Sequence, residues 1–123
     1  MTAAGLGIDL IEIARIERAL DRRPRLARRL FTDRELEYAA SFGRPGRHLA
    51  ARFAAKEAVV KALALGPGTA MRDIEVLTGA PPEVHLHSEV ARIATERGLG
   101  VKVSLTHDRG MAAAIAMTVP QGT

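Results

Sequence analysis

The sequence contains no cysteine and few aromatic residues, only three phenylalanines and one tyrosine. Without cysteine the chain has no disulfide framework, thiol nucleophile, cysteine-ligated zinc or iron–sulfur cluster. The scarcity of aromatic side chains disfavours a protein that binds single-stranded nucleic acid by stacking its bases. No apolar run approaches the ~20 residues that cross a bilayer, and the N-terminal stretch lacks the basic start of a signal peptide. We therefore expect a cytoplasmic protein that makes no membrane contact.

Length and composition are typical of one globular domain. The chain has 123 residues, of which 47% are hydrophobic and 26% are charged. A chain of this length can bury a core of its own but is too short for two domains of ordinary size. We therefore predict a single domain over residues 1–123, with enough apolar content to be ordered.

Positive charge is concentrated in one short segment, residues 15–29. This segment holds seven arginines and two acidic residues, a net charge of +5, whereas the whole chain carries +4. The rest of the chain is therefore slightly acidic. A basic surface on one element is typical of docking to an acidic partner, and both a nucleic acid and an acidic protein fit that description.

Hydrophobic periodicity predicts an α+β domain. Thr32 followed by Glu35 is typical of a helix that opens with a capping box. The predicted strands span residues 6–13, 73–78, 83–87, 101–106 and 111–119, and the predicted helices span residues 13–23, 33–40, 47–65 and 88–97. This order favours a small, mostly antiparallel sheet with helices on one side.

The longest predicted helix carries charged residues among apolar ones. At about 100° per residue, large apolar side chains occupy one side and alanines most of the other, so most of this helix is expected to be buried. The charged residues within it are Arg52, Lys56, Glu57 and Lys61. Buried charges must pair or bind a ligand, because isolated ones are costly. The alternative is an ordinary surface network in which Glu57 pairs with Lys61 at i,i+4 spacing.

Asp9 interrupts the first predicted strand. Gly7 shares its face and is expected to leave room beside the carboxylate; the alternative is an exposed aspartate on an edge strand. If Asp9 and Glu57 converge, two carboxylates without cysteine or paired histidine suit a hard cation such as Mg²⁺, with substrate phosphates as further ligands. The basic residues of the long helix would then flank those phosphates.

Further polar features have alternative interpretations. His107 follows a strand, where it would contact a phosphate or move a proton, or else be an ordinary surface histidine of a turn. His85 and His87 share one strand face, but a zinc site would need further ligands, which we do not find nearby. The segment that starts at Gly66 is too short and irregular for a phosphate-binding loop, and we interpret it as a helix stop.

Four segments, in order and at characteristic spacing, resemble the holo-[acyl-carrier-protein] synthases, the small 4′-phosphopantetheinyl transferases. They are GLGIDLIEIARI (5–16), FT.RE (31–35), ARFAAKEAVVKAL (51–63) and VSLTHD (103–108). Such enzymes transfer the 4′-phosphopantetheine arm of coenzyme A to a serine of an apo acyl carrier protein and release adenosine 3′,5′-bisphosphate, with Mg²⁺ required. The resemblance implies this reaction, for fatty acid biosynthesis, in a homotrimer with active sites between α+β subunits.

The resemblance also implies which residues take part in catalysis and which bind the phosphates. Asp9 and Glu57 match the strand and helix carboxylates that hold Mg²⁺ in the family. Lys61, four residues after Glu57, matches a lysine that contacts a coenzyme A phosphate. Arg52 and Lys56 fall at the basic positions of the motif and would face the phosphates.

Other positions match residues that bind coenzyme A or the carrier protein in the family. His107 matches a histidine that reaches the cofactor across the subunit interface, and Gly66 begins a loop that lies near the adenosine end. Arg15, Arg22 and Arg25 fall where relatives use basic side chains to bind the acidic helix of the carrier protein. This implication agrees with the basic segment found from charge alone.

Several alternatives stay open on the sequence. The acceptor could be a carrier of polyketide or peptide synthetases. A nucleic-acid-binding module would explain the arginines but not Asp9, Glu57 or His107, and nucleic acid is not the partner we expect. A Mg²⁺-dependent phosphohydrolase would share the carboxylates but need no docking surface. The serine proton could pass to Glu57, to Asp33 or to a metal-bound water. Residues 79–82 depart from the family pattern, which usually has a basic residue before the proline.

Overall fold

The computed structural model of the chain describes residues 5–122. Its elements are β1 (Leu6–Glu12), α1 (Ile13–Arg22), α2 (Leu26–Leu30), α3 (Asp33–Ala40), α4 (Pro45–Ala62), the 3₁₀ turn η1 (Met71–Asp73), β2 (Ile74–Leu77), β3 (Glu83–Leu86), α5 (Ser88–Arg97), β4 (Leu99–Asp108) and β5 (Met111–Pro120). The α+β class is confirmed. The short helix α2, which follows Pro24, was not predicted.

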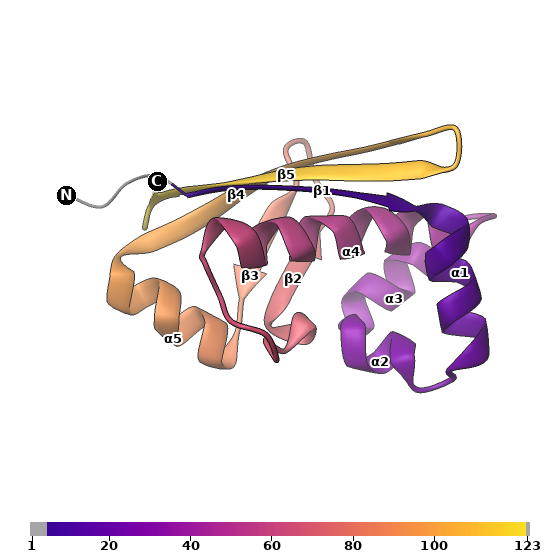
Figure 1. Ribbon diagram of the computed structural model, residues 1–123, viewed down its shortest axis with the longest axis horizontal. Coiled ribbons are helices and arrows are strands. Elements are labelled where there is room, and N and C mark those ends of the chain that lie inside the picture. Colours follow the sequence, from indigo (N-terminus) through magenta and orange to yellow (C-terminus); the bar gives the residue numbers. More distant parts are fainter. Residues whose placement is uncertain (1–4, 123) are drawn as a thin grey trace.

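The strands form two antiparallel sheets rather than the single sheet predicted. β1, β5 and β4 form the larger sheet, in the order β1-β5-β4, and β2 pairs separately with β3. Figure 1 shows the helices on one side of the larger sheet, with α4 running along it. The predicted arrangement, helices on one side of a small antiparallel sheet, therefore holds for the larger sheet.

Local sequence signals determine where several elements begin and end. The Thr32 side chain accepts a hydrogen bond from the Glu35 N–H (3.3 Å), and Glu35 Oε1 accepts one from the Thr32 N–H (2.8 Å), which is the predicted capping box. Arg109 and Gly110 have φ values of 49° and 79° and form the two-residue turn between β4 and β5. His107, predicted to lie in this turn, is therefore still part of β4.

The core lies between α4 and the larger sheet. Ala58 of α4 and Ala114 of β5 are buried there, and such small side chains let the helix approach the strands closely. Gly7 of β1 lies against the helix backbone, because a Cβ at this position would be 2.0 Å from the carbonyl oxygen of Ala58. The expectation that Gly7 leaves room beside Asp9 was therefore wrong: the glycine permits contact between strand and helix.

Figure 1 shows no helix over the opposite face of the larger sheet in the described part of the chain. Apolar residues on that face are exposed. They are Leu6, Ile8 and Leu10 of β1, and Ile115 and Met117 of β5. The first strand, predicted to be buried, is thus buried on one face only within a single chain. Among residues 5–122 no helix has the length and apolarity needed to span a membrane.

Candidate functional site

Asp9 and Glu57 meet in one cavity. Asp9 lies on β1 and Glu57 on α4, and both line a cavity of about 420 Å³. Burial raises the pKa of Glu57, the negative charge of Asp9 raises it further, and the positive charge of Lys61 opposes both. The structure therefore brings together the two carboxylates on which the metal prediction depends, with their mutual repulsion only partly balanced.

Lys61 connects α4 to β1 beside this pair. Its Nζ donates a hydrogen bond to the carbonyl oxygen of Ile8 (2.9 Å) and lies 3.5 Å from Asp9 Oδ1. Among the described residues, this contact takes the place of the Glu57–Lys61 ion pair considered as an alternative. The lysine side chain is 54% exposed, so the pair contributes little stability and the ammonium remains accessible to a ligand.

The chemistry of the two carboxylates suits a hard cation. Carboxylate oxygens are ligands that Mg²⁺ prefers, and Mg²⁺ commonly binds one or two of them together with water and substrate phosphates. Within residues 5–122, no histidine and no further acidic residue joins Asp9 and Glu57 as a third metal ligand. An incomplete ligand set of this kind fits a cation that a phosphate substrate completes, and a cation would relieve the repulsion felt by Glu57.

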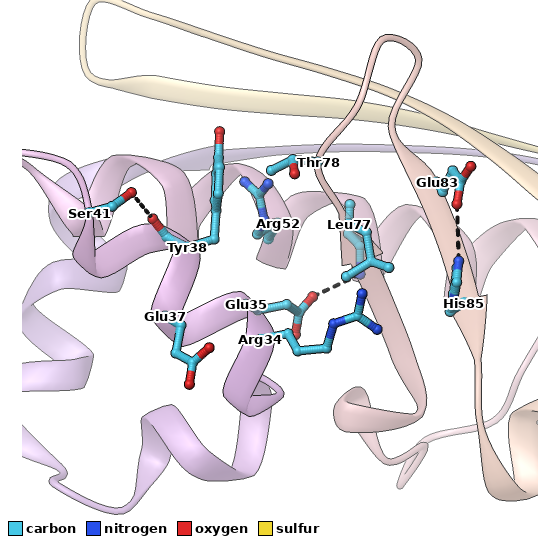
Figure 2. A pocket seen from close by; sticks show the side chains of 11 residues that line it. Arg34, Glu35, Glu37, Tyr38, Ser41, Arg52, Leu77, Thr78, Glu83 and His85 are labelled. Carbon is cyan, nitrogen blue, oxygen red and sulfur yellow. Dashed lines mark hydrogen bonds and ion pairs between the residues drawn. The ribbon is translucent and has the colours of Figure 1, made fainter.

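Arg52 lines a second, polar cavity. Its side chain is 5% exposed, and its guanidinium lies 4.5 Å from the centre of the Tyr38 ring. Its buried Nε has no hydrogen-bond partner among the described residues, which is costly unless a ligand supplies one. Figure 2 shows Arg52 between Tyr38 and Thr78. The cavity that these side chains line lies between α3 and the β2–β3 hairpin and has a volume of about 640 Å³.

Arg52 and His107 lie together in an adjoining cavity. This cavity of about 300 Å³, called here the Arg52–His107 cavity, is also lined by His48 and Thr78. It shares no lining residue with the cavity of Asp9 and Glu57. Within a single chain, the two carboxylates therefore lie in a cavity separate from the Arg52–His107 cavity.

Lys56 does not face a ligand site, and the prediction that it would contact coenzyme A phosphates is corrected. Its side chain is fully buried. Its Nζ donates to Glu35 Oε1 (2.8 Å) and to the carbonyl oxygens of Met71 (2.9 Å) and Ile74 (2.5 Å). All three ammonium hydrogens are thus used inside the protein. The capping-box pattern identified Glu35 in the sequence. It did not indicate that Glu35 contacts Lys56, 21 residues later in the chain.

The arginines assigned to carrier docking are exposed. Arg15 lines the cavity of Asp9 and Glu57, Arg22 ends α1, and Arg25 immediately precedes α2. The apolar residues of the same cavity include Ile16, Leu26, Leu30 and Phe53. Positive charge thus flanks an apolar groove next to the carboxylates.

The last of the predicted positions, Gly66, lies in an exposed loop. The helix α4 ends at Ala62, earlier than predicted, because the chain leaves the helix at Ala64, which has a φ of 52°. In the loop that follows, the Thr69 hydroxyl donates to the Gly66 carbonyl (2.7 Å).

Sequence reasoning gave no role to Tyr38 and His48, which line the Arg52–His107 cavity. A signal for His48 was present, because it lies four residues before Arg52 in the same helix and therefore on the same side. Tyr38 comes from a different helix, α3, and no spacing in the sequence indicates that it lies over the guanidinium.

The chain is similar to known proteins over nearly its whole length. A family model described as the 4′-phosphopantetheinyl transferase superfamily matches residues 5–116. The holo-[acyl-carrier-protein] synthase of Moorella thermoacetica is 50% identical over 115 residues, 90% of each chain. A solved ACPS–CoA complex from Chronobacterium ammoniagenes has a TM-score of 0.86 at 28% identity, covering 98% of this chain and 99% of that one. The acyl carrier protein synthase of Mycobacterium tuberculosis has a TM-score of 0.77 at 37% identity, covering 94% and 96%. The chain therefore belongs to the 4′-phosphopantetheinyl transferase superfamily.

Proposed function

We propose that this chain is a holo-[acyl-carrier-protein] synthase that serves fatty acid biosynthesis in the cytoplasm. The serine oxygen of an apo acyl carrier protein forms a bond to the β-phosphorus of coenzyme A, and the pyrophosphate P–O bond breaks. The 4′-phosphopantetheine arm is transferred, adenosine 3′,5′-bisphosphate leaves, and the serine proton is lost. The observation that carries this proposal is that Asp9 and Glu57 lie together in a groove that Arg15 also lines. The chain is also 50% identical in sequence to a holo-[acyl-carrier-protein] synthase over 115 residues.

Asp9 and Glu57 would hold Mg²⁺, which when bound would neutralise charge on the pyrophosphate. Lys61 lies within 3.5 Å of Asp9 and would place a second positive charge beside the phosphate oxygens. Phosphoryl transfer depends mainly on positioning and on neutralising developing charge, and the protein has little covalent chemistry to perform. Fixed charges on a rigid strand and helix meet that requirement, because they need not reorganise during the reaction.

We propose that the complete active site forms between subunits of a homotrimer. The Arg52–His107 cavity is separate from the carboxylates within one chain, and we propose that coenzyme A uses the carboxylates of one copy and this cavity of its neighbour. The uncovered apolar face of β1 and β5 supports association, since monomers rarely leave such a surface exposed. A monomeric mass in light scattering would contradict this part of the proposal.

The carrier protein would dock on α1 and α2. The arginines of this region, including Arg15, Arg22 and Arg25, are exposed, and an apolar groove runs from them to the carboxylates. An acidic carrier helix would find both charge complementarity and an apolar contact there. The serine it carries would then enter the groove near Asp9.

Of the two carboxylates considered as acceptors of the serine proton, Glu57 is better placed. Asp33 has an 81% exposed side chain and lies 3.7 Å from Arg72, and it does not line the acidic cavity. Glu57 does line it, in the groove through which the serine of the carrier would enter. We therefore propose Glu57 rather than Asp33 for this role.

The test is the intact mass of an apo acyl carrier protein after incubation with this protein and coenzyme A, with Mg²⁺ and with EDTA. We expect a mass gain of one phosphopantetheine only when the metal is present. No gain with carriers from fatty acid, polyketide and peptide synthetases would contradict the proposal. Release of adenosine 3′,5′-bisphosphate without any carrier would instead indicate a phosphohydrolase.

A further inference from the structure

His48 lines the Arg52–His107 cavity but has no part in the reaction described above. It lies one helical turn before Arg52 on α4, so the two side chains share one side of the helix. Its ring stacks on Phe42, with centroids 3.8 Å apart and an interplanar angle of 27°, and meets the edge of Tyr38 at 5.9 Å. This packing holds the imidazole against the cavity wall.

A second imidazole enters the same cavity from β4. The His107 ring centre lies 6.1 Å from that of His48, with the rings at 77° to each other. Arg52 adds a guanidinium whose buried Nε has no partner among the described residues. None of the residues that line this cavity is acidic. The cavity thus gathers one permanent cation and two protonatable rings without a counter-charge, which is the environment an anion requires.

Burial and nearby positive charges disfavour the charged form of His48 when no ligand is present. Arg47 and Arg52 lie on its own helix, His107 comes from β4, and the phenol of Tyr38 comes from α3. Burial lowers the pKa of His48, and the charges of Arg52, His107 and Arg47 lower it further. The ligand-free ring is therefore a neutral imidazole near pH 7. An anion among these cations would oppose their effect and favour protonation.

We propose that His48 is a further anion-binding residue of the Arg52–His107 cavity, and that it takes up a proton when a phosphate of coenzyme A enters. This inference rests on the proposed function, in which Arg52 and His107 bind that ligand. The protonated ring donates a charge-assisted hydrogen bond to a phosphate oxygen while Phe42 keeps it in place. Because the bound state holds more protons than the free state, coenzyme A binds more tightly as the pH falls.

Calorimetric titration of the whole protein with coenzyme A tests this inference. The titration is done at about pH 7 in two phosphate-free buffers of different ionisation enthalpy, whose heats give the number of protons taken up. We expect uptake by the wild type, and less by His48→Phe, which keeps an aromatic ring against Phe42. Between about pH 8 and pH 6, the affinity of the wild type should rise about fivefold to tenfold more than that of His48→Phe. Comparison of the two proteins cancels the titration of the nucleotide phosphate itself, whose second pKa is about 6.

His87→Gln is the matched control. His87 does not line this cavity and lies 3.0 Å from Glu75, a contact that glutamine can keep, so we expect proton uptake as in the wild type. Dephospho-coenzyme A, which lacks the 3′-phosphate, identifies the phosphate concerned. If the excess uptake of the wild type over His48→Phe is lost with this ligand, the inference is supported for the 3′-phosphate; if the excess is retained, it is supported for the pyrophosphate.

Nuclear magnetic resonance of the unmodified protein gives a second measurement, needed if His48→Phe does not fold. With only four histidines in the chain, their ring signals can be resolved, and adenosine 3′,5′-bisphosphate should move the His48 titration to higher pH. An unmoved titration, or equal proton uptake by the wild type and His48→Phe, would overturn this inference and leave the proposed function intact. Failure of the wild type to bind coenzyme A at all would contradict the proposed function and this inference with it.

Discussion

Lys56 and Glu35 form an ion pair inside the protein, with Nζ 2.8 Å from Oε1 and neither side chain exposed. The carboxylate also accepts hydrogen bonds from the backbone N–H groups of Thr32 and Val76, and the ammonium donates to two backbone carbonyl groups. Both charges are thus fully hydrogen-bonded, the condition under which a buried pair is tolerated. The pair joins α3, α4 and β2, the elements that enclose the Arg52 side chain.

Lys56→Met should destabilise the protein by about 3–5 kcal/mol, because it leaves the Glu35 carboxylate buried without a counter-charge. The double variant Glu35→Gln with Lys56→Met should lose less than the sum of the two single variants, since the charges are removed together. Urea unfolding measures both quantities. Arg92→Met, which breaks two exposed ion pairs on α5, should leave the unfolding midpoint nearly unchanged. Additive losses from the two buried residues would contradict their coupling.

The inward position of Lys56 could not be predicted from the sequence. Helical spacing places Lys56 on the same side of α4 as Arg52, four residues earlier, and about 100° away from Glu57. The residue that directs Lys56 inward is Glu35, far away in the sequence and on another helix. Its contact depends on how α3 packs against α4, and no local pattern encodes that packing.

The meeting of Asp9 and Glu57 was easier to predict. Each carboxylate interrupts an apolar element, and a strand and a helix that pack together bring such interruptions to one interface. By contrast, the separation of His107 from these carboxylates depends on the tertiary placement of β4. The sequence likewise indicated most helices and strands, but not the division of the strands into two sheets, because strand pairing is a long-range choice.

Gly7→Ala should push β1 away from α4. The added Cβ would lie 2.0 Å from the carbonyl oxygen of Ala58, a backbone atom that cannot rotate aside. We expect a loss of about 3 kcal/mol in unfolding free energy and reduced transferase activity, because Asp9 is on the same strand. Gly43→Ala is the control, since a Cβ there meets nothing within 4 Å, and its effect should stay within about 0.5 kcal/mol. Equal melting temperatures for the two variants would show that β1 can shift freely.

Glu57→Gln should remove Mg²⁺-dependent turnover while making the metal-free protein more stable. The loss of a ligand carboxylate is expected to lower the rate at least about 100-fold. The gain in stability follows because burial and the charge of Asp9 disfavour the ionised glutamate. Glu96→Gln, an exposed position on α5, is the control for loss of one negative charge and should change neither property appreciably.

The pH dependence of stability gives Glu57 a separate signature. Its pKa is raised in the folded protein, so folding takes up a proton, and the metal-free wild type loses stability as the pH rises from the ordinary glutamate value of 4.5 into the range above it. Glu57→Gln should lack this loss, and added Mg²⁺ should suppress it in the wild type. Thermal melts across this pH range, with and without Mg²⁺, measure this loss of stability. If stability depends on pH in the same way for both metal-free proteins, burial and the charge of Asp9 do not raise the pKa of Glu57 as assigned here.

Arg22→Glu should weaken association with the carrier protein and leave the affinity for coenzyme A nearly unchanged. Arg22 is exposed at the end of α1 and does not line the cavity of the carboxylates. Charges on such a surface act mainly on the association rate with an acidic partner, and salt screens them. We expect the KM for the carrier to rise about tenfold at low ionic strength, with the difference shrinking as salt is added. Arg92→Glu makes the same change of charge on α5, so a similar rise in KM there would indicate an effect of net charge alone. Wild-type KM values for both Arg22→Glu and Arg25→Glu would place the carrier on a different surface, and the basic segment would then need another acidic partner.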